Sequence, residues 1–164
     1  MDSNDISLGS IFAFPDKPLP SVKIACTGNR CCNGAPLHTD GYRHPLVVID
    51  CDGNSVDVLK ISSRKPEERF AADYLKILGL RTHPDLREPD GLLLDKGAMD
   101  HDSYVNMRYS YNVLISSLKV FRASEPRLSP KSFEALKRHL HNRERPANFQ
   151  RDRIVSEDHT RRPT

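Results

Sequence analysis

The chain has 164 residues, of which 37% are hydrophobic and 29% charged, and its formal net charge is +3. This length predicts a single domain with a hydrophobic core of its own, and the weak positive charge permits an anionic partner without requiring one. The sequence holds no apolar run near the roughly 18 residues of a membrane span. Residues 1–9 carry Asp2 and Asp5 where a signal peptide would be basic. We therefore expect a cytoplasmic protein outside the membrane, with a nuclear location also open.

A short strand and a long loop are the first predicted elements. Residues 10–14 (Ser-Ile-Phe-Ala-Phe) lie between Gly9 and Pro15 and predict the strand. Residues 15–42 contain four prolines and three glycines, which predicts an irregular loop. A loop of this length in a compact domain is usually functional or disordered.

The cysteines predict neither a disulfide framework nor a metal site. The chain has four of them, at Cys26, Cys31, Cys32 and Cys51. Four cysteines in a chain this long do not form a disulfide scaffold. The first three cluster with His38 and His44 along the sequence, but the adjacent pair suits tetrahedral zinc poorly and no Cys-x-x-Cys spacing occurs. We expect no metal and no cofactor. A metal-binding domain built on the loop from Cys26 to His38 is kept as an alternative.

A β-hairpin is the strongest local prediction. Residues 44–51 and 55–62 are rich in Val, Leu and Ile and are separated by a short polar segment. Asp-Gly between two apolar runs is a strong hairpin signal, because a type I′ turn requires positive φ at both central positions. We therefore predict an antiparallel hairpin whose turn is centred on Asp52 and Gly53.

The register of this hairpin decides which side chains meet at its open end. The predicted turn places Arg43 opposite Ser62. Moving the turn by one residue would instead place Asp50 opposite Asp57, and like charges directly opposite each other are destabilising. We therefore predict the first register, which brings a guanidinium and a hydroxyl to one face with His44 beside them.

Further strands are predicted downstream. Residues 73–78 fit either a strand or the end of a short helix, since the length of the run does not decide between them. Residues 91–95 form another short apolar run. Residues 103–107 and 109–115 are rich in β-branched and aromatic side chains and predict two strands. Residues 114–121 are compatible with a short turn of helix.

The clearest helix is predicted for residues 130–141. Ser129 suits the N-cap and Pro130 the first helical position. Apolar side chains recur at helical spacing, at Phe133, Leu136 and Leu140. Residues 142–164 are rich in Arg and poor in apolar side chains, which predicts a disordered basic tail after a single domain at residues 1–141.

Five short segments occur along the chain in a characteristic order. They are Gly9-Ser-Ile-Phe, Gly41-Tyr-Arg-His-Pro-Leu-Val-Val-Ile, Ile61-Ser-Ser, Asp102-Ser-Tyr-Val and Leu128-Ser-Pro-Lys-Ser-Phe-Glu-Ala-Leu. Over residues 8–141 this series resembles the MazF/PemK family of growth-inhibiting endoribonucleases. The resemblance implies a mainly β fold with a C-terminal helix, a small SH3-like β-barrel that here carries long inserted loops.

The resemblance also implies an activity. Family members cleave single-stranded RNA without a metal, so we expect a toxin-type endoribonuclease that forms a homodimer and has a protein inhibitor as partner. An Arg just before a Pro and a Thr at the end of the next strand do the chemistry in the family. The Arg position falls on His44 here and the Thr position on Ser62, while Arg43 is one residue away. Because adjacent strand residues face opposite ways, either a β-bulge returns Arg43 to the cleft or His44 itself transfers protons.

The expected reaction is attack of a ribose 2′-OH on the adjacent phosphate, which needs a proton acceptor, a proton donor and a cation. His44 would be the acid or base, Arg43 would bind the phosphate, and Ser62 would orient an oxygen or a water. The candidate RNA-binding residues are Ser63, Tyr104 and Asn106. Of these, Tyr104 would stack on a base, as tyrosine rings do. The alternative is a non-catalytic barrel that binds protein or nucleic acid.

Overall fold

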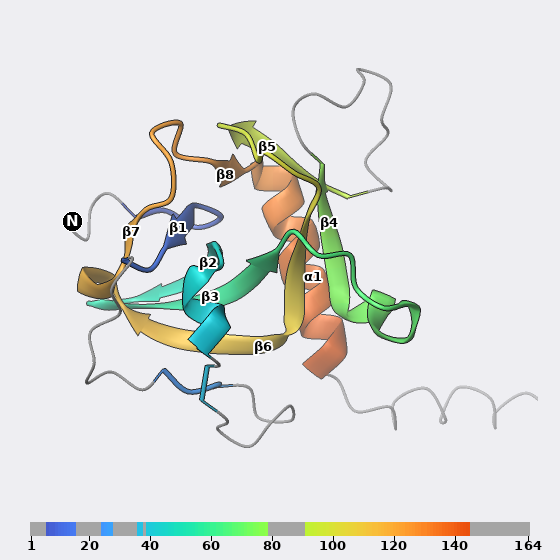
Figure 1. Cartoon of the computed structure of the whole chain (residues 1–164), viewed down its shortest axis with the longest axis horizontal. Helices are drawn as coiled ribbons and strands as arrows, with labels where there is room; N and C mark the ends of the chain where they lie inside the picture. Colours follow the sequence, from blue (N-terminus) through green and yellow to red (C-terminus); the bar gives the residue numbers. More distant parts are fainter. Residues whose placement is uncertain (1–5, 16–23, 28–35, 38, 79–90, 145–164) are drawn as a thin grey trace, which may run out of the picture.

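The computed structural model describes residues 6–15, 24–27, 36–37, 39–78 and 91–144. Within them, eight strands follow the order β7-β1-β2-β3-β6-β4-β5-β8 in one sheet, and one α-helix, α1, lies against it (Figure 1). The strands are β1 (Ile11–Ala13), β2 (Leu46–Asp52), β3 (Ser55–Ser62), β4 (Tyr74–Leu78), β5 (Leu92–Lys96), β6 (Ser103–Leu114), β7 (Lys119–Val120) and β8 (Arg127–Leu128). The helices are α1 (Pro130–Glu144) and the 3₁₀ turns η2 (Thr39–Arg43), η3 (Glu68–Asp73) and η5 (Ile115–Ser117). The predicted mainly β fold with a C-terminal helix is confirmed.

The core lies on both sides of β2 and β3. Val48 and Val58 belong to one buried cluster, and Val47 and Leu59 belong to a second cluster that includes Leu136 of α1. Successive side chains of a strand point to opposite faces, so a strand that is apolar at every position is buried on both sides. The unbroken apolar run of β2 therefore marks it as a central strand.

Strand β8, at one end of the sheet, approaches the residues just before β1 near the other end, without forming a continuous ladder. Ser10 and Arg127 form a single bridge. Beside it, the Ile11 amide donates to the Pro126 carbonyl (2.9 Å) and the Leu128 amide donates to the Gly9 carbonyl (3.0 Å). The expected barrel is therefore not closed by regular pairing. The physical reason is the length of β1, whose three residues already pair with β2 and with β7.

The predicted register of the β2–β3 hairpin is wrong. Asp52 pairs with Ser55, so the turn is centred on residues 53–54 and Asp50 lies opposite Asp57. Gly53 has a φ of +57°, and the only non-glycine residue with positive φ in the described ranges is Glu125. Positive φ at the first central position alone is the type II′ pattern, which suits a hairpin as well as type I′ does.

Local hydrogen bonds explain why the two carboxylates tolerate each other. Asn112 Nδ2 donates to Asp57 Oδ1 (2.9 Å), and the Cys51 amide donates to Asp50 Oδ1 (3.0 Å). Asp50 is also exposed, so water screens the repulsion. A β-bulge between Val48 and Asp50 then shifts the rest of β2 by one residue against β3.

Strand β6 is one bent strand where two separate strands were predicted. In its first half, Tyr104 and Val105 pair with the end of β3. In its second half, residues 110–114 pair with the start of β3. Residues 106–109 between the two halves do not pair with β3 and form an irregular corner. Figure 1 shows the sharp turn of β6 at this corner. The first half of β6, before the corner, runs along β4. Residues 74–78 form β4, so the choice between strand and helix resolves as strand.

The predicted helix is confirmed and extends three residues further. The Ser132 amide donates to Ser129 Oγ (3.2 Å), which is the expected N-cap bond. Phe133 and Leu136 are buried against the sheet. Because α1 continues to Glu144, the predicted start of the tail at residue 142 is wrong, and residues 145–164 lie outside the described residues. In the described part of the chain, no helix is both long enough and apolar enough to span a bilayer.

Parts of the predicted loop at residues 15–42 pack on the sheet. Ile24, Cys26 and Leu37 are buried in the first core cluster, and Cys26 bridges to Tyr111 of β6. The loop is thus not irregular throughout, because its apolar side chains cover one face of β6. Cys31, Cys32 and His38 lie outside the described residues, as does the segment at 79–90.

Candidate nucleic-acid interface

One face of β3, β6 and β4 points away from α1. Ile61, Val105 and Ile77 belong to the same buried cluster as Phe133 and Leu136 of α1, so their side chains point toward the helix. Side chains alternate along a strand. The neighbours of these three residues therefore point to the other side of the sheet.

The side chains on that side form a polar row, which we call the polar face: Ser62, Tyr104, Lys76, Tyr74 and Asn106. Ser62 lies opposite Tyr104 across β3 and β6, Tyr104 lies opposite Lys76 across β6 and β4, and Asn106 lies opposite Tyr74. Directly opposite residues of antiparallel strands share a face and are in contact distance. The structure thus brings Ser62, Tyr104 and Asn106, three of the residues singled out in the sequence, to one surface.

Asn106 supports this face from within. Its side chain is buried, with 4% of the residue exposed. Nδ2 donates to the Tyr74 hydroxyl (3.1 Å), and Oδ1 accepts from the Arg108 amide (2.9 Å). The amide therefore holds the β6 corner to β4 and does not present its polar atoms outward.

His44 is the predicted catalytic residue that lies nearest to Ser62 along the paired chains. Leu46 pairs with Lys60, and the Ile61 amide donates to the Pro45 carbonyl (2.8 Å). The pairing thus reaches Pro45 and Ile61, and His44 is the next residue, in the bend after η2 where its amide donates to the Gly41 carbonyl (3.2 Å). The same register continued by one residue would place His44 opposite Ser62. The predicted pairing of Arg43 with Ser62 is therefore wrong, because the turn is centred one residue later than predicted and the bulge in β2 reverses only part of that shift.

Arg43 and Ser63 flank this end of the polar face. Arg43 is the last residue of η2 and is exposed, since β2 begins only at Leu46. Ser63 is exposed directly after β3. Ser62 is half-buried, and its Oγ accepts from the Arg64 amide (3.1 Å), which turns the chain away from the strand.

An open pocket of about 680 Å³ lies over the polar face. Its lining residues are Lys65, Pro66, Glu68, Ala71, Tyr74, Leu75, Lys76, Gly91 and Tyr104. One wall is thus the segment at 65–71, and the floor comes from β4 and β6. A volume of this order accommodates a small-molecule or nucleotide-sized group.

The pocket carries two lysines and a tyrosine that keeps its proton. Lys76 Nζ lies 2.9 Å from Asp102 Oδ2, and this hydrogen bond raises the pKa of Lys76, so the amine stays charged. Burial raises the pKa of Tyr74, the charges near it on Asp73 and Tyr109 add to the increase, and Arg108 opposes it. Tyr74 is therefore a hydroxyl donor or acceptor at neutral pH and not a base.

Lys65, Tyr74 and Lys76 were missed by sequence reasoning. The alternation of Tyr74 and Lys76 with Leu75 and Ile77 has the period of a half-buried strand. Once residues 74–78 are taken as a strand, that pattern places Tyr74 and Lys76 on its polar side; it does not find Lys65.

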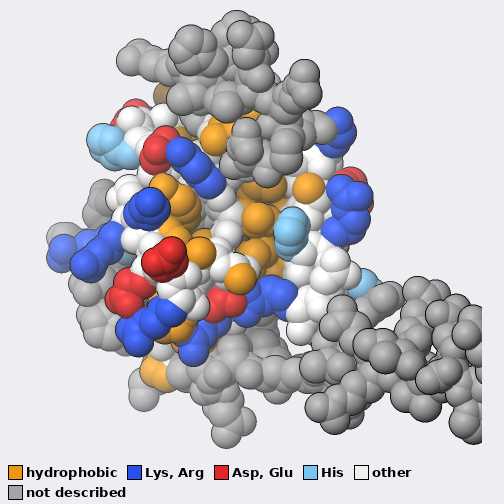
Figure 2. Space-filling model, turned by 90° about the vertical axis from the view of Figure 1, so that its right-hand side faces the viewer, with side chains coloured by type: hydrophobic (Ala, Val, Ile, Leu, Met, Phe, Trp, Pro, Cys, Tyr) orange, Lys and Arg blue, Asp and Glu red, His pale blue; other side chains and the backbone are white. Residues whose placement is uncertain are grey.

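Charges of both signs surround the site. Figure 2 looks onto the side of the molecule where β4 and α1 lie in Figure 1, and it shows Lys and Arg side chains interspersed with Asp and Glu. Among the described residues, no three His, Cys, Asp or Glu side chains gather as a metal site would need.

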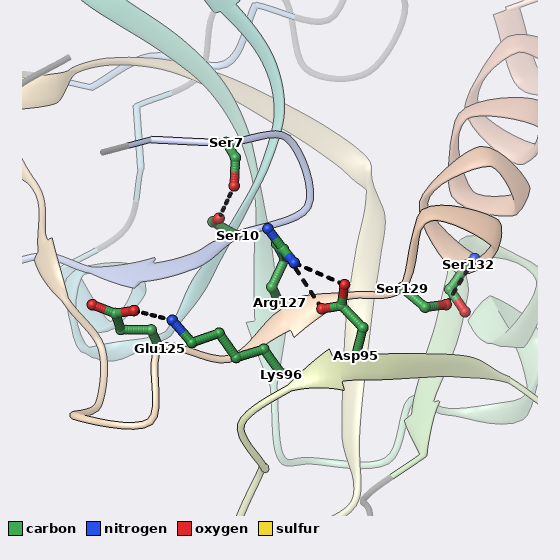
Figure 3. A network of polar contacts seen from close by, with 8 residues as sticks. All are labelled: Ser7, Ser10, Asp95, Lys96, Glu125, Arg127, Ser129 and Ser132. Carbon is green, nitrogen blue, oxygen red and sulfur yellow. Dashed lines mark hydrogen bonds and ion pairs between the residues drawn. The ribbon is translucent and has the colours of Figure 1, made fainter. Parts of the chain in front are cut away.

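A second polar cluster joins β5 to β8 and serves the fold. Arg127 donates two hydrogen bonds to Asp95 (3.1 and 2.9 Å), and Lys96 pairs with Glu125 (Figure 3). Because each charge here has a partner of opposite sign across the two strands, we assign this cluster to strand pairing. A comparison of the sequence with models of known protein families and with curated proteins finds no match.

Proposed function

We propose that this protein binds single-stranded RNA across the polar face and cleaves it without a metal, with His44 and Ser62 at the reacting phosphate. The observation that carries the proposal is the hydrogen bond from the Ile61 amide to the Pro45 carbonyl (2.8 Å), which extends the β2–β3 register to the residues next to His44 and Ser62. Ser62 in turn lies opposite Tyr104 of β6, and Lys76 of β4 lies opposite Tyr104 on its other side. A proton-transferring side chain, a hydroxyl, a stacking ring and a cation are thus neighbours on one surface.

The reaction needs groups that these residues supply. The ribose 2′-oxygen bonds to phosphorus as the bond to the 5′-oxygen breaks, leaving a cyclic phosphate and a free 5′-OH. One group takes the 2′-OH proton and another protonates the 5′-oxygen. An imidazole exchanges protons near neutral pH, so His44 would take one of these roles, and a water oriented by Ser62 would take the other. Lys65 and Lys76 would bind the charged phosphate oxygens.

The test is cleavage of a mixed-sequence single-stranded RNA in EDTA. Wild-type protein should cut it, and His44→Ala should lower the rate by about 10²–10⁴, the usual contribution of a general acid or base. His101→Ala is the matched control, because His101 is an exposed histidine at the entrance to β6. A rate equal to wild type in His44→Ala would disprove the catalytic role.

A second candidate is RNA or protein binding without cleavage. The position of Arg43 favours it, because this arginine is exposed on η2 and is not in register with Ser62. This candidate predicts that RNA stays intact yet binds with an affinity that falls steeply as salt rises. Membership of the MazF/PemK family, the homodimer and the protein inhibitor stay predictions from the resemblance.

A further inference from the structure

Arginine and aromatic side chains interleave at the β6 corner, next to the pocket. Arg69 Cζ lies 4.6 Å from the centroid of the Phe70 ring, and Arg108 Cζ lies 5.3 Å from the same centroid. Arg108 is also 5.4 Å from the ring of Tyr109. We call Arg69, Phe70 and Arg108 the arginine stack.

The arginine stack is connected to β6 at one end and to α1 through η3. The Arg108 amide is held by Asn106 Oδ1 at the corner of β6. Asp73, the last residue of η3, forms an ion pair with Arg143 of α1. Since η3 also contributes Glu68 and Ala71 to the pocket wall, the stack and the pocket share this segment.

The outward side of the stack is open. The Arg69 side chain is 71% exposed, and its Nε pairs with the exposed carboxylate of Glu67 at 2.8 Å. A planar guanidinium that covers a ring with one face can take a second ring on the other. Base stacking on aromatic and arginine planes is a common way to hold unpaired nucleotides.

We propose that the arginine stack is a nucleobase-binding subsite beside the pocket over the polar face, where Lys65 and Lys76 would bind the phosphate. The proposal rests on the proposed function and names its ligand more closely, as a strand with an unpaired base next to the bound phosphate. The pocket lining carries Glu68 beside Lys65 and Lys76, and an acidic side chain there weakens the attraction of phosphates by charge alone. Stacking on the arginine stack would therefore supply the discrimination between a nucleic acid and other polyanions.

The test compares two fluorescent oligonucleotides of about eight nucleotides, both with 2′-O-methyl ribose so that no 2′-OH is free to attack, one with all its bases and one with abasic central positions. Their charges are equal, so a difference in dissociation constant measures base contacts. Wild-type protein should bind the intact strand about 5–100-fold more tightly, the range expected for stacking of one base. Arg108→Lys keeps the charge but loses the plane, and Phe70→Leu keeps an apolar side chain but loses the ring. Both should reduce the difference between the two affinities, which Tyr104 stacking would still maintain in part, without weakening binding of the abasic strand.

Arg138→Lys, on the exposed face of α1, is the matched control and should leave both affinities unchanged. Thermal unfolding establishes that each variant is folded. Equal binding of both strands by wild-type protein, or variants that weaken both strands alike, would overturn the subsite and leave the proposed function standing. If neither strand binds, the proposed function and the subsite both fail.

Discussion

At the scale of single residues, Asn106 differs most from its predicted role. It is one of the three candidate RNA-binding residues predicted from the sequence, with Ser63 and Tyr104. Alternation along the strand correctly puts Asn106 and Tyr104 on one face. It does not reveal that the corner of β6 closes over Asn106, because that depends on pairing with β4 in another part of the chain. Asn106 is thus a positioning residue for Tyr74 and Arg108.

We expect Asn106→Ala to lower the free energy of unfolding by about 1–3 kcal/mol, because the Arg108 amide loses its acceptor in a buried corner. Urea denaturation measures the change. Asn112→Ala is the control: Asn112 is an exposed amide that bonds to Asp57, so its removal should cost less than half as much. Equal losses in the two variants would mean that the buried amide does not hold the corner.

At the scale of elements, local signals predict the helix well and the hairpin only in part. The cap at Ser129 and the apolar spacing of Phe133 and Leu136 act within a few residues, and α1 follows them. The hairpin itself is also present. Its register depends on the bulge in β2 and on the hydrogen bond from Asn112 of β6 to Asp57, neither of which a pairwise charge argument includes.

Two substitutions in the turn test the observed register. Gly53→Ala should destabilise the protein by about 1–2 kcal/mol, because φ is +57° and a Cβ there would strain the backbone without touching any other atom. Asn54→Ala should cost little, since residue 54 does not have positive φ. Thermal unfolding of the two variants gives the comparison. A larger loss for Asn54→Ala than for Gly53→Ala would argue for a type I′ turn or another register.

At the scale of the whole molecule, the candidate site exists because three strands distant in sequence meet. The end of β3, the first half of β6 and β4 each supply alternate residues to the polar face. The sequence predicts the strands at 55–62 and 103–107 and names three of the residues. The order of the strands and the sharp turn of β6 are non-local, so the pocket and the place of Lys65 in its wall could not be predicted, whereas the alternation along residues 74–77 marks Lys76 as a surface residue of a strand.

The central claim is that RNA binds on the polar face. Backbone amide NMR of the full chain, titrated with a single-stranded oligoribonucleotide, tests it most directly. We expect the amide signals of Ser62, Lys76 and Tyr104 to shift together and to saturate at one dissociation constant, while those around Asp95 and Arg127 stay in place. Shifts confined to the β5–β8 side, or no shifts at all, would contradict it.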